Sequence, residues 1–256
     1  MTLTLTGINT LPIVEPGADL GQLICRALEE SHLSLVENDI VVITQKIVSK
    51  AENRFVNLSE VQPSTRAVEL AQQVNKDARL VELVLLESRK VIRAANNVLI
   101  VEHKQGFICA NAGIDHSNVS GPWGEQSDWV LLLPEDSDAS ARSIRDEIQK
   151  ITGIAPIGVL IIDSHSRAWR VGTVGTTIGL AGVPGVVDLR GYSDLYGYKM
   201  QYTIISAADE LAGAASLVMG QIDERIPVVH ARGFPYSLRE SSLKEMLRLE
   251  QNDLFR

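Results

Sequence analysis

The sequence predicts an α+β protein with mixed, largely antiparallel sheets and helices. Segments with strand patterns and segments with helix patterns follow one another without the regular βαβ alternation that builds a doubly wound parallel sheet. Residues 96–115 hold two apolar runs on either side of HKQG, a pattern typical of a hairpin. A chain of 256 residues can bury a substantial core, so we expect residues 1–256 to form a single domain, with two subdomains as the alternative.

The N-terminal part of the chain predicts two strands and three helices before the hairpin. Polar and apolar residues alternate in the first strand, and apolar residues recur at helical spacing in the helices. The second strand is an apolar run that becomes polar at Thr44. In chain order we expect a strand over 3–8, a helix over 17–31, a strand over 39–44, and helices over 64–75 and 78–90.

The C-terminal part continues the mixture. After a strand and a turn, a helix is expected to begin near Ser137 or Ser140 and to stop at Gly153. The next apolar run predicts a strand that ends on an acid, Asp163. The glycine-rich stretch 172–185 indicates tight turns between short strands. We further expect a helix over 207–220, a strand over 226–233, and a surface helix or partner contact in the tail 241–256.

Composition and charge narrow the class of protein. Hydrophobic residues make up 45% of the chain and charged residues 22%, which is ordinary for a soluble domain. The formal net charge of −8 argues against broad nucleic-acid binding, which depends on Lys and Arg neutralising phosphates. No basic segment with a long apolar core opens the chain, and no apolar run approaches the roughly 20 residues of a membrane helix. We expect a cytoplasmic protein with no nucleic-acid or membrane partner and, with two cysteines, no disulfide framework.

Two strands are expected to end on an aspartate. GFICANAGID ends on Asp115, and VLIIDS ends on Asp163 followed by Ser164. Carboxylates with a neighbouring hydroxyl are hard oxygen ligands, which suit Mg²⁺ or Mn²⁺ held together with substrate phosphates. The alternative is that each aspartate only caps a turn or a helix.

Basic residues follow the apolar strand that ends at Thr44. Lys46, Lys50 and Arg54 lie in this segment, and lysines placed so can direct compact positive charges at phosphates. The alternative is a solvated basic loop. The five glycines of 172–185 permit close backbone approach, but this stretch matches neither GxxxxGK[ST] nor GxGxxG.

The sequence lacks the motifs that are typical of serine hydrolases and of zinc sites. Residues 163–166, DSHS, place an acid, two hydroxyls and an imidazole side by side, yet a catalytic triad is assembled in space and the chain has no GxSxG elbow. The five histidines show no HExxH spacing.

Six ordered segments together resemble a known family. They are ITQKIVSKAENR, GFICANAGIDHSN, LLPEDSDASAR, IIDSHSRAWRVGTVGTTIGLAG, ADELAGAASLVMGQ and IPVVHARG. In this order they resemble the coenzyme F-420 gamma-glutamyl ligase family, and the similarity runs from LPIV at residue 11 to RG at residue 233. Some members carry a fused nitroreductase-like domain; this chain is similar in length to the stand-alone form, without that domain.

The resemblance implies a GTP-dependent ligase. Such enzymes form an amide between L-glutamate and the terminal carboxylate of a deazaflavin coenzyme F-420 precursor, and then add gamma-linked glutamates. The resemblance also implies two divalent ions per site, Mg²⁺ or Mn²⁺, assistance from K⁺, and a two-lobed, intertwined homodimer. Two alternatives keep the same pocket: a catalytically silent regulator that binds nucleotide or deazaflavin, and a metal-dependent GTP phosphohydrolase.

Carried over position by position, the resemblance assigns ligands and contacts. Asp115 and Asp163 correspond to ligands of one metal, and Ser164 and Gln221 to ligands of the second. Lys50, with the two aspartates, is assigned to catalysis. The expected nucleotide contacts are Leu11, Pro12, Ile13, Val14, Gln45, Lys46, Lys50, Asn118, Met219, Gly220, Gln221, Ile222, Asp223, Glu224, Arg225 and Ile226.

A few of these positions depart from the usual family pattern. Ser164 stands where many relatives have Thr, which keeps a hydroxyl. The pair Gln45–Lys46 replaces a small hydroxyl pair of archaeal relatives, and ENR at 52–54 replaces EGR at a turn. Gln221 is a neutral ligand, so we expect it to bind its metal weakly.

The implied reaction explains why such residues are needed. A carboxylate does not react with an amine at neutral pH, so GTP first phosphorylates it, and the amine of glutamate then displaces phosphate. The first step brings two anions together, and cations and lysines must neutralise the charge. Ala110, Ala112 and Gly113, just before Asp115, would let the nucleotide come close. The sequence names no base for the amine.

Overall fold

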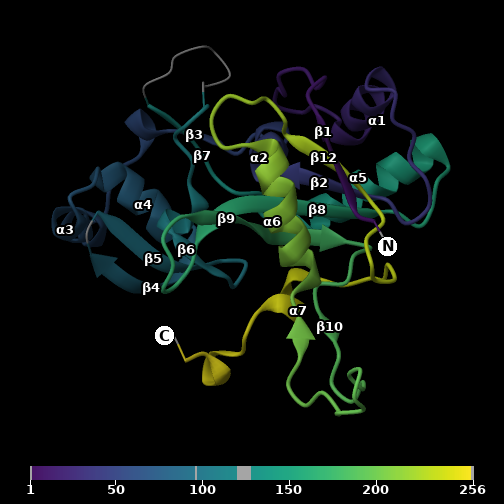
Figure 1. Ribbon diagram of the computed structural model, residues 1–256. Coiled ribbons are helices and arrows are strands. Elements are labelled where there is room, and N and C mark those ends of the chain that lie inside the picture. The colour runs from purple at the N-terminus through teal and green to yellow at the C-terminus, as the bar shows by residue number, and fades with distance from the viewer. Residues whose placement is uncertain (1, 96, 120–127, 255–256) are drawn as a thin grey trace.

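The central sheet confirms the expected α+β class. The computed structural model describes residues 2–95, 97–119 and 128–254 (Figure 1). β2 and β8 of the central sheet run parallel, and the other neighbouring pairs of strands are antiparallel. In spatial order the five strands are β1 (Thr4–Ile8), β12 (Val228–Arg232), β2 (Ile40–Thr44), β8 (Gly158–Ser166) and β9 (Thr173–Ala181).

One edge of this sheet collects strand ends from distant parts of the chain. Ile8 pairs with Val228, Val228 with Ile43, and Ile43 with Ile161. Because β1, β2 and β8 run in the same direction, the chain leaves all three strands at one edge, and it enters β12 there. We call this edge, marked by those four residues, the site edge.

Helices cover both faces of the sheet. In Figure 1 α6 (Ala207–Met219) crosses the front of it, and α5 (Ser137–Thr152) packs on β8 and β9 from the opposite face. A Cβ on Gly175 would lie 2.4 Å from the carbonyl oxygen of Ala212 in α6, and one on Gly179 would lie 2.4 Å from the carbonyl oxygen of Ser137 in α5. The expected turns over 172–185 are therefore wrong for most of the stretch, because these glycines serve close helix contacts inside one continuous strand.

Two predicted helices are confirmed, although α1 begins later than residue 17, and α5 matches at both ends. α1 (Leu20–Glu30), which packs against α5, is capped by Asp19, whose Oδ1 accepts a hydrogen bond from Gln22 N at 3.0 Å. α5 begins after Asp136 and ends at Gly153, which has a φ of 70°. Both helices turn an apolar side toward the core, which includes Ile24 of α1.

A second sheet joins the hairpin to a strand that the sequence pattern does not reveal. The predicted hairpin is confirmed as β5 (Val98–His103) and β6 (Ile108–Ala110), and α3 (Thr65–Val74) is confirmed as a helix. The helix expected over 78–90 is wrong at its end, because α4 (Ala78–Leu86) stops and β4 (Ser88–Ala95) pairs with β5. Pairing with a neighbour thus overrides the local helical pattern.

Smaller elements complete the fold. β3 (Phe55–Asn57) pairs with β7 (Trp129–Leu131), and β10 (Val187–Asp188) pairs with β11 (Ile204–Ile205). Residues 187–205 form an arm that extends from the body in Figure 1. The tail helix is largely wrong: of 241–254, only α7 (Leu243–Met246) is α-helical, with a 3₁₀ turn over Glu250–Asn252, as also occurs over Leu58–Glu60 and Asn111–Gly113.

The buried apolar side chains form two clusters. The main core joins the central sheet, its helices and the second sheet, and includes Val42, Leu99 and Leu160, each with 0% of its surface exposed. A smaller cluster of Leu58, Leu83, Val130 and Leu132 lies beside β7. Among the described residues, no helix has both the length and the apolar character needed to cross a membrane.

Candidate active site

Asp115 lies beside the first turn of α2 (Gln45–Ala51). Gln45 donates a hydrogen bond from Nε2 to Asp115 Oδ2, and Lys46 Nζ lies 3.6 Å from Asp115 Oδ1. The backbone of Asp115 exchanges two hydrogen bonds of 2.9 Å with Leu131. Asp115 does not end a strand as expected, because β6 ends at Ala110 and a 3₁₀ turn intervenes. Two hydrogen-bonded neighbours nevertheless fix its position.

α2 replaces the polar loop that we considered after Thr44. The helix begins directly at Gln45, so Lys46 and Lys50, four residues apart, lie on the same side of it. Lys46 Nζ donates to the carbonyl oxygen and the hydroxyl of Ser117, at 3.3 and 3.1 Å, and Lys50 Nζ donates to the carbonyl oxygen of Asn118 at 3.1 Å. The alternative of a solvated basic loop is wrong.

The loop after α6 reaches the same place from a third segment. Asn118 Nδ2 donates to the carbonyl oxygen of Ile222 at 3.1 Å, and Ser164 Oγ donates to Gln221 Oε1 at 3.0 Å. Gly220, with a φ of 73°, allows the chain to turn out of α6. In Figure 1 this loop curves beside α2.

Asp163 lies within β8 and not at its end. The strand continues to Ser166, and Asp163 pairs with Thr176 of β9, so the expected strand end is wrong. Successive side chains of a strand point to opposite faces, so Asp163 and Ser164 face different sides of the sheet. Asp163 Oδ2 lies 3.1 Å from His165 Nε2, and its Oδ1 accepts from Ser164 N at 2.8 Å.

The electrostatics of Asp115 and Lys50 reflect this crowding. Burial raises the pKa of Asp115 to about 6; the charge of Asp163 adds to the rise, and Lys46 and Gln45 oppose it. Burial also lowers the pKa of Lys50, and the charge of Lys46 adds to that effect, while Asp115 opposes it. Asp115 thus lies near a second carboxylate and near two lysines, and a further cation would relieve the repulsion between the two carboxylates.

The order of the strands shows where the remaining predicted nucleotide contacts lie. Residues 11–14 follow β1 at the site edge, where Val14 is buried and Ile13 has 89% of its surface exposed. Residues 219–226 lead into β12 at the same edge. The site edge therefore gathers the N-terminal segment, α2, Asp163, Ser164 and the 219–226 loop.

The donor set fits a hard divalent cation. Among the described residues, no three His, Cys, Asp or Glu side chains gather closely enough to hold a metal ion. The predicted ligands include only two carboxylates, with a hydroxyl and an amide, so substrate phosphates would have to complete the coordination. Asp115 beside Asp163 and Ser164 against Gln221 supply oxygen atoms of the required kind.

Sequence reasoning overlooked two partners in this site. Ser117 accepts from Lys46, and His165 contacts Asp163. His165 also faces Phe107, whose ring lies 5.4 Å away, centre to centre. The signal for His165 was its place two residues after Asp163 in a strand, which puts both side chains on one face.

Comparisons with known proteins identify the family of the chain. The family model described as "F420-0:Gamma-glutamyl ligase" matches residues 7–233. A "Coenzyme F420:L-glutamate ligase" of Methanothermobacter thermautotrophicus is 42% identical over 100% of both chains. Proteins with the same name from Methanopyrus kandleri and Methanocaldococcus jannaschii are 40% identical over 95% of this chain and 93% of the relative, and 36% identical over 96% and 94%. The chain belongs to the F420-0:Gamma-glutamyl ligase family.

Proposed function

We propose that this protein is a GTP-dependent ligase that joins L-glutamate to the terminal carboxylate of the deazaflavin coenzyme F-420 precursor and then adds gamma-linked glutamates. Family membership and the names of the relatives support the ligation. One observation carries the proposal. At the site edge, Asp115 lies near Lys46 and Lys50, and it is close enough to Asp163 for the charge of Asp163 to raise its pKa. Acids and lysines in one place suit phosphoryl transfer between anions.

In the proposed reaction the γ-phosphoryl group of GTP passes to the precursor carboxylate. The acyl phosphate then loses phosphate when the glutamate amine attacks. Lys46 and Lys50 offset negative charge as the two anions approach, and α2 holds both side chains on one side. Gln45 and Lys46 hold Asp115 in place.

Divalent cations belong to the same proposal. Asp115, Asp163, Ser164 and Gln221 would hold Mg²⁺ or Mn²⁺, two per site, and K⁺ assists without a residue assigned to it. When bound, such ions neutralise phosphate charge and polarise the transferring group. Residues 11–14, Asn118 and the 219–226 loop would hold the nucleotide around them.

We also propose a homodimer with an intertwined, two-lobed shape. The arm 187–205 supports it, because the arm exposes large side chains far from the core. Exposed fractions reach 97% for Leu195, 95% for Tyr196 and 87% for Tyr202. Exposed apolar groups gathered on one segment favour association with another surface.

The proposed function is tested by mass spectrometry of products. Purified protein is incubated with GTP, Mg²⁺ or Mn²⁺, L-glutamate and the deazaflavin precursor. We expect precursor mass plus one or more glutamates, with GDP and phosphate formed only when both acceptor and glutamate are present. GDP release without glutamate incorporation would instead favour a phosphohydrolase, and nucleotide binding without any product would favour a silent regulator.

A further inference from the structure

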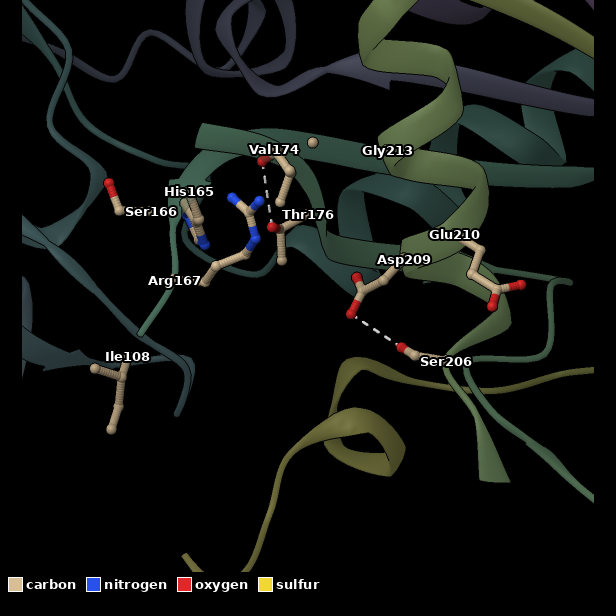
Figure 2. A pocket seen from close by; sticks show the side chains of 11 residues that line it. Ile108, His165, Ser166, Arg167, Val174, Thr176, Ser206, Asp209, Glu210 and Gly213 are labelled. Carbon is tan, nitrogen blue, oxygen red and sulfur yellow. Dashed lines mark hydrogen bonds between the residues drawn. The ribbon is translucent and has the colours of Figure 1, made fainter. Parts of the chain in front are cut away.

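A cavity of about 510 Å³ lies next to the proposed reaction site, along the free edge of β9. Its walls come from the end of β8, the start of β9 and the first turns of α6, with Ile108 of β6 on the remaining side (Figure 2). His165 links it to the site, because its ring lines the cavity and its Nε2 lies 3.1 Å from Asp163 Oδ2. Only the side chain of His165 would thus separate a ligand in this cavity from Asp163.

The cavity combines one cation with two carboxylates. Arg167 lines one side, and its Nη1 donates to the carbonyl oxygen of Gly172 at 3.1 Å. Asp209 and Glu210 line the other side in Figure 2. Asp209 is held in place, since its Oδ1 accepts from Thr177 N and its Oδ2 from Ser206 Oγ, both at 2.9 Å. Glu210 is exposed and makes no such bond in the described part of the chain.

Glycines keep the wall between β9 and α6 thin. The closest atom to a Cβ placed on Gly213 would be the carbonyl oxygen of Gly175, at 3.9 Å. Both glycines line the cavity, so backbone and not side chains forms this part of the wall. The hydroxyls of Ser166 and Thr176 add polar groups to it.

From this charge pattern we infer that the cavity is the subsite for the amino-acid substrate, L-glutamate, with Arg167 binding a carboxylate and Glu210 the ammonium group. This inference rests on the proposed function. The deazaflavin precursor carries only anionic groups at its reacting end, so the two carboxylates would repel it. An amino acid carries a positive ammonium group and negative carboxylates. Hydrogen bonds from or to such charged groups are stronger than those between neutral groups. The cavity adjoins Asp163 through His165, so an amino acid bound there would lie next to the proposed reaction site.

Steady-state kinetics of Arg167→Gln and Glu210→Gln test this assignment. We expect the KM for L-glutamate to rise about tenfold or more in each, because each change removes the charge that pairs with the amino acid. The KM values for GTP and for the deazaflavin precursor should stay within about twofold. Arg167→Lys, which keeps the charge and loses the planar fork, should fall between wild type and Arg167→Gln. Matched controls are Arg170→Gln and Glu69→Gln, both exposed and outside the cavity, and they should behave as wild type.

Calorimetric titration distinguishes the role of Arg167 from that of Glu210. L-Glutamate should bind about tenfold more weakly to both Gln variants, and glutarate, which lacks the ammonium group, should be weakened only by Arg167→Gln. Unchanged glutamate binding in both variants, or an effect confined to the deazaflavin KM, would overturn the assignment. If the wild type makes no ligation product but binds L-glutamate through these residues, the proposed function fails and the cavity assignment stands. Circular dichroism checks that each variant is folded.

Discussion

Ser164 Oγ lies 3.0 Å from Gln221 Oε1, so the hydroxyl of β8 contacts the amide of the loop after α6 across 57 residues of sequence. Asp163 precedes Ser164 and faces the other side of the strand, and its charge raises the pKa of Asp115. The proposed ligands therefore lie on both sides of one strand, which is how two ions could share a phosphate chain.

Gln221→Glu should increase the affinity of the enzyme for its divalent cation, because it adds a charged ligand where the wild type has a neutral one. We expect the Mn²⁺ concentration for half-maximal ligation to fall about three- to tenfold in Gln221→Glu and to rise in Gln221→Ala. The measurement is ligation rate against Mn²⁺ at saturating GTP. Gln72→Glu, on the exposed side of α3, is the control and should match wild type. Equal Mn²⁺ dependence in all variants would remove Gln221 from the metal site.

Asp115→Asn should abolish ligation and yet stabilise the protein without cation. Burial raises the pKa of Asp115 from 3.8 to about 6, so the native state binds more protons than the unfolded state between those values. The stability of the wild type therefore falls as pH rises from about 3.8 to about 6 and levels off above that, and this loss is absent in the Asn variant. The shift corresponds to about 1–3 kcal/mol at pH 7. Urea unfolding in EDTA at pH 7.5 and pH 3.5 measures it.

The two pH values supply the control for that prediction. At pH 3.5 the carboxyl group is mostly protonated in both states, so the wild type and Asp115→Asn should differ little there. A variant less stable than wild type at pH 7.5 would show that the contacts with Gln45 and Lys46 outweigh the cost of burial.

Asp163→Asn should remove most activity and keep the fold. An amide there keeps one oxygen to accept from Ser164 N and presents its NH2 group to His165 Nε2, but it loses the charge that a cation requires. We expect ligation to fall at least about 100-fold, with an unchanged circular dichroism spectrum. The surface change Asp146→Asn, on α5, is the matched control. A folded Asp163→Asn enzyme with full activity would refute the assignment of Asp163.

Local patterns predict the elements that carry their own signals. α1 and α5 have capping aspartates and an apolar stripe, and the hairpin has a polar turn between apolar runs. β4 lacks such a signal, because SRKVIRAA becomes a strand only by pairing with β5. β8 likewise extends past Asp163 because β9 pairs with it as far as Ser166. Pairing partners distant in sequence decide both cases.

The site is harder to predict for the same reason. Residues alone suggested Asp115 and Asp163 for cations and Lys46 and Lys50 for phosphates, and the resemblance added Gln221 and most of the nucleotide contacts. Their convergence depends on the parallel pairing of β2 with β8 and on the place of β12 between β1 and β2. The cavity beside Arg167 and Glu210 has no sequence motif, since its walls come from four separate segments.

Asp39 should contribute strongly to stability. It has 1% of its surface exposed, and both of its oxygens accept from Arg232, at 2.9 and 2.7 Å, while His230 Nε2 lies 2.8 Å from Oδ2. Burial opposes ionisation of Asp39, but the bonds from Arg232 and His230 outweigh it and lower its pKa. Asp39→Ala leaves His230 buried without its partner, so we expect a loss of about 3–5 kcal/mol.

The measurement for Asp39 is urea unfolding at pH 7 and at pH 3. Because its native pKa is lowered, its contribution is present above the usual value of 3.8 and is lost as pH falls through the lower native value. The gap between wild type and Asp39→Ala should therefore narrow at acid pH. Asp188→Ala, which removes an exposed pair with Arg190, should change stability little at either pH.

Gly175 and Gly213 face one another across the contact of β9 with α6, and they should respond oppositely to alanine. A Cβ on Gly175 would lie 2.4 Å from the carbonyl oxygen of Ala212 and 2.7 Å from Ser216 Cβ, so α6 must move away from the sheet. Such overpacking costs about 1–3 kcal/mol. Gly213→Ala meets its nearest atom at 3.9 Å and lies inside a helix, where alanine is favoured by about 0.5–1 kcal/mol. Thermal unfolding of both variants decides the point: if Gly175→Ala were as stable as Gly213→Ala, close packing of α6 on β9 would not be the reason for glycine at 175.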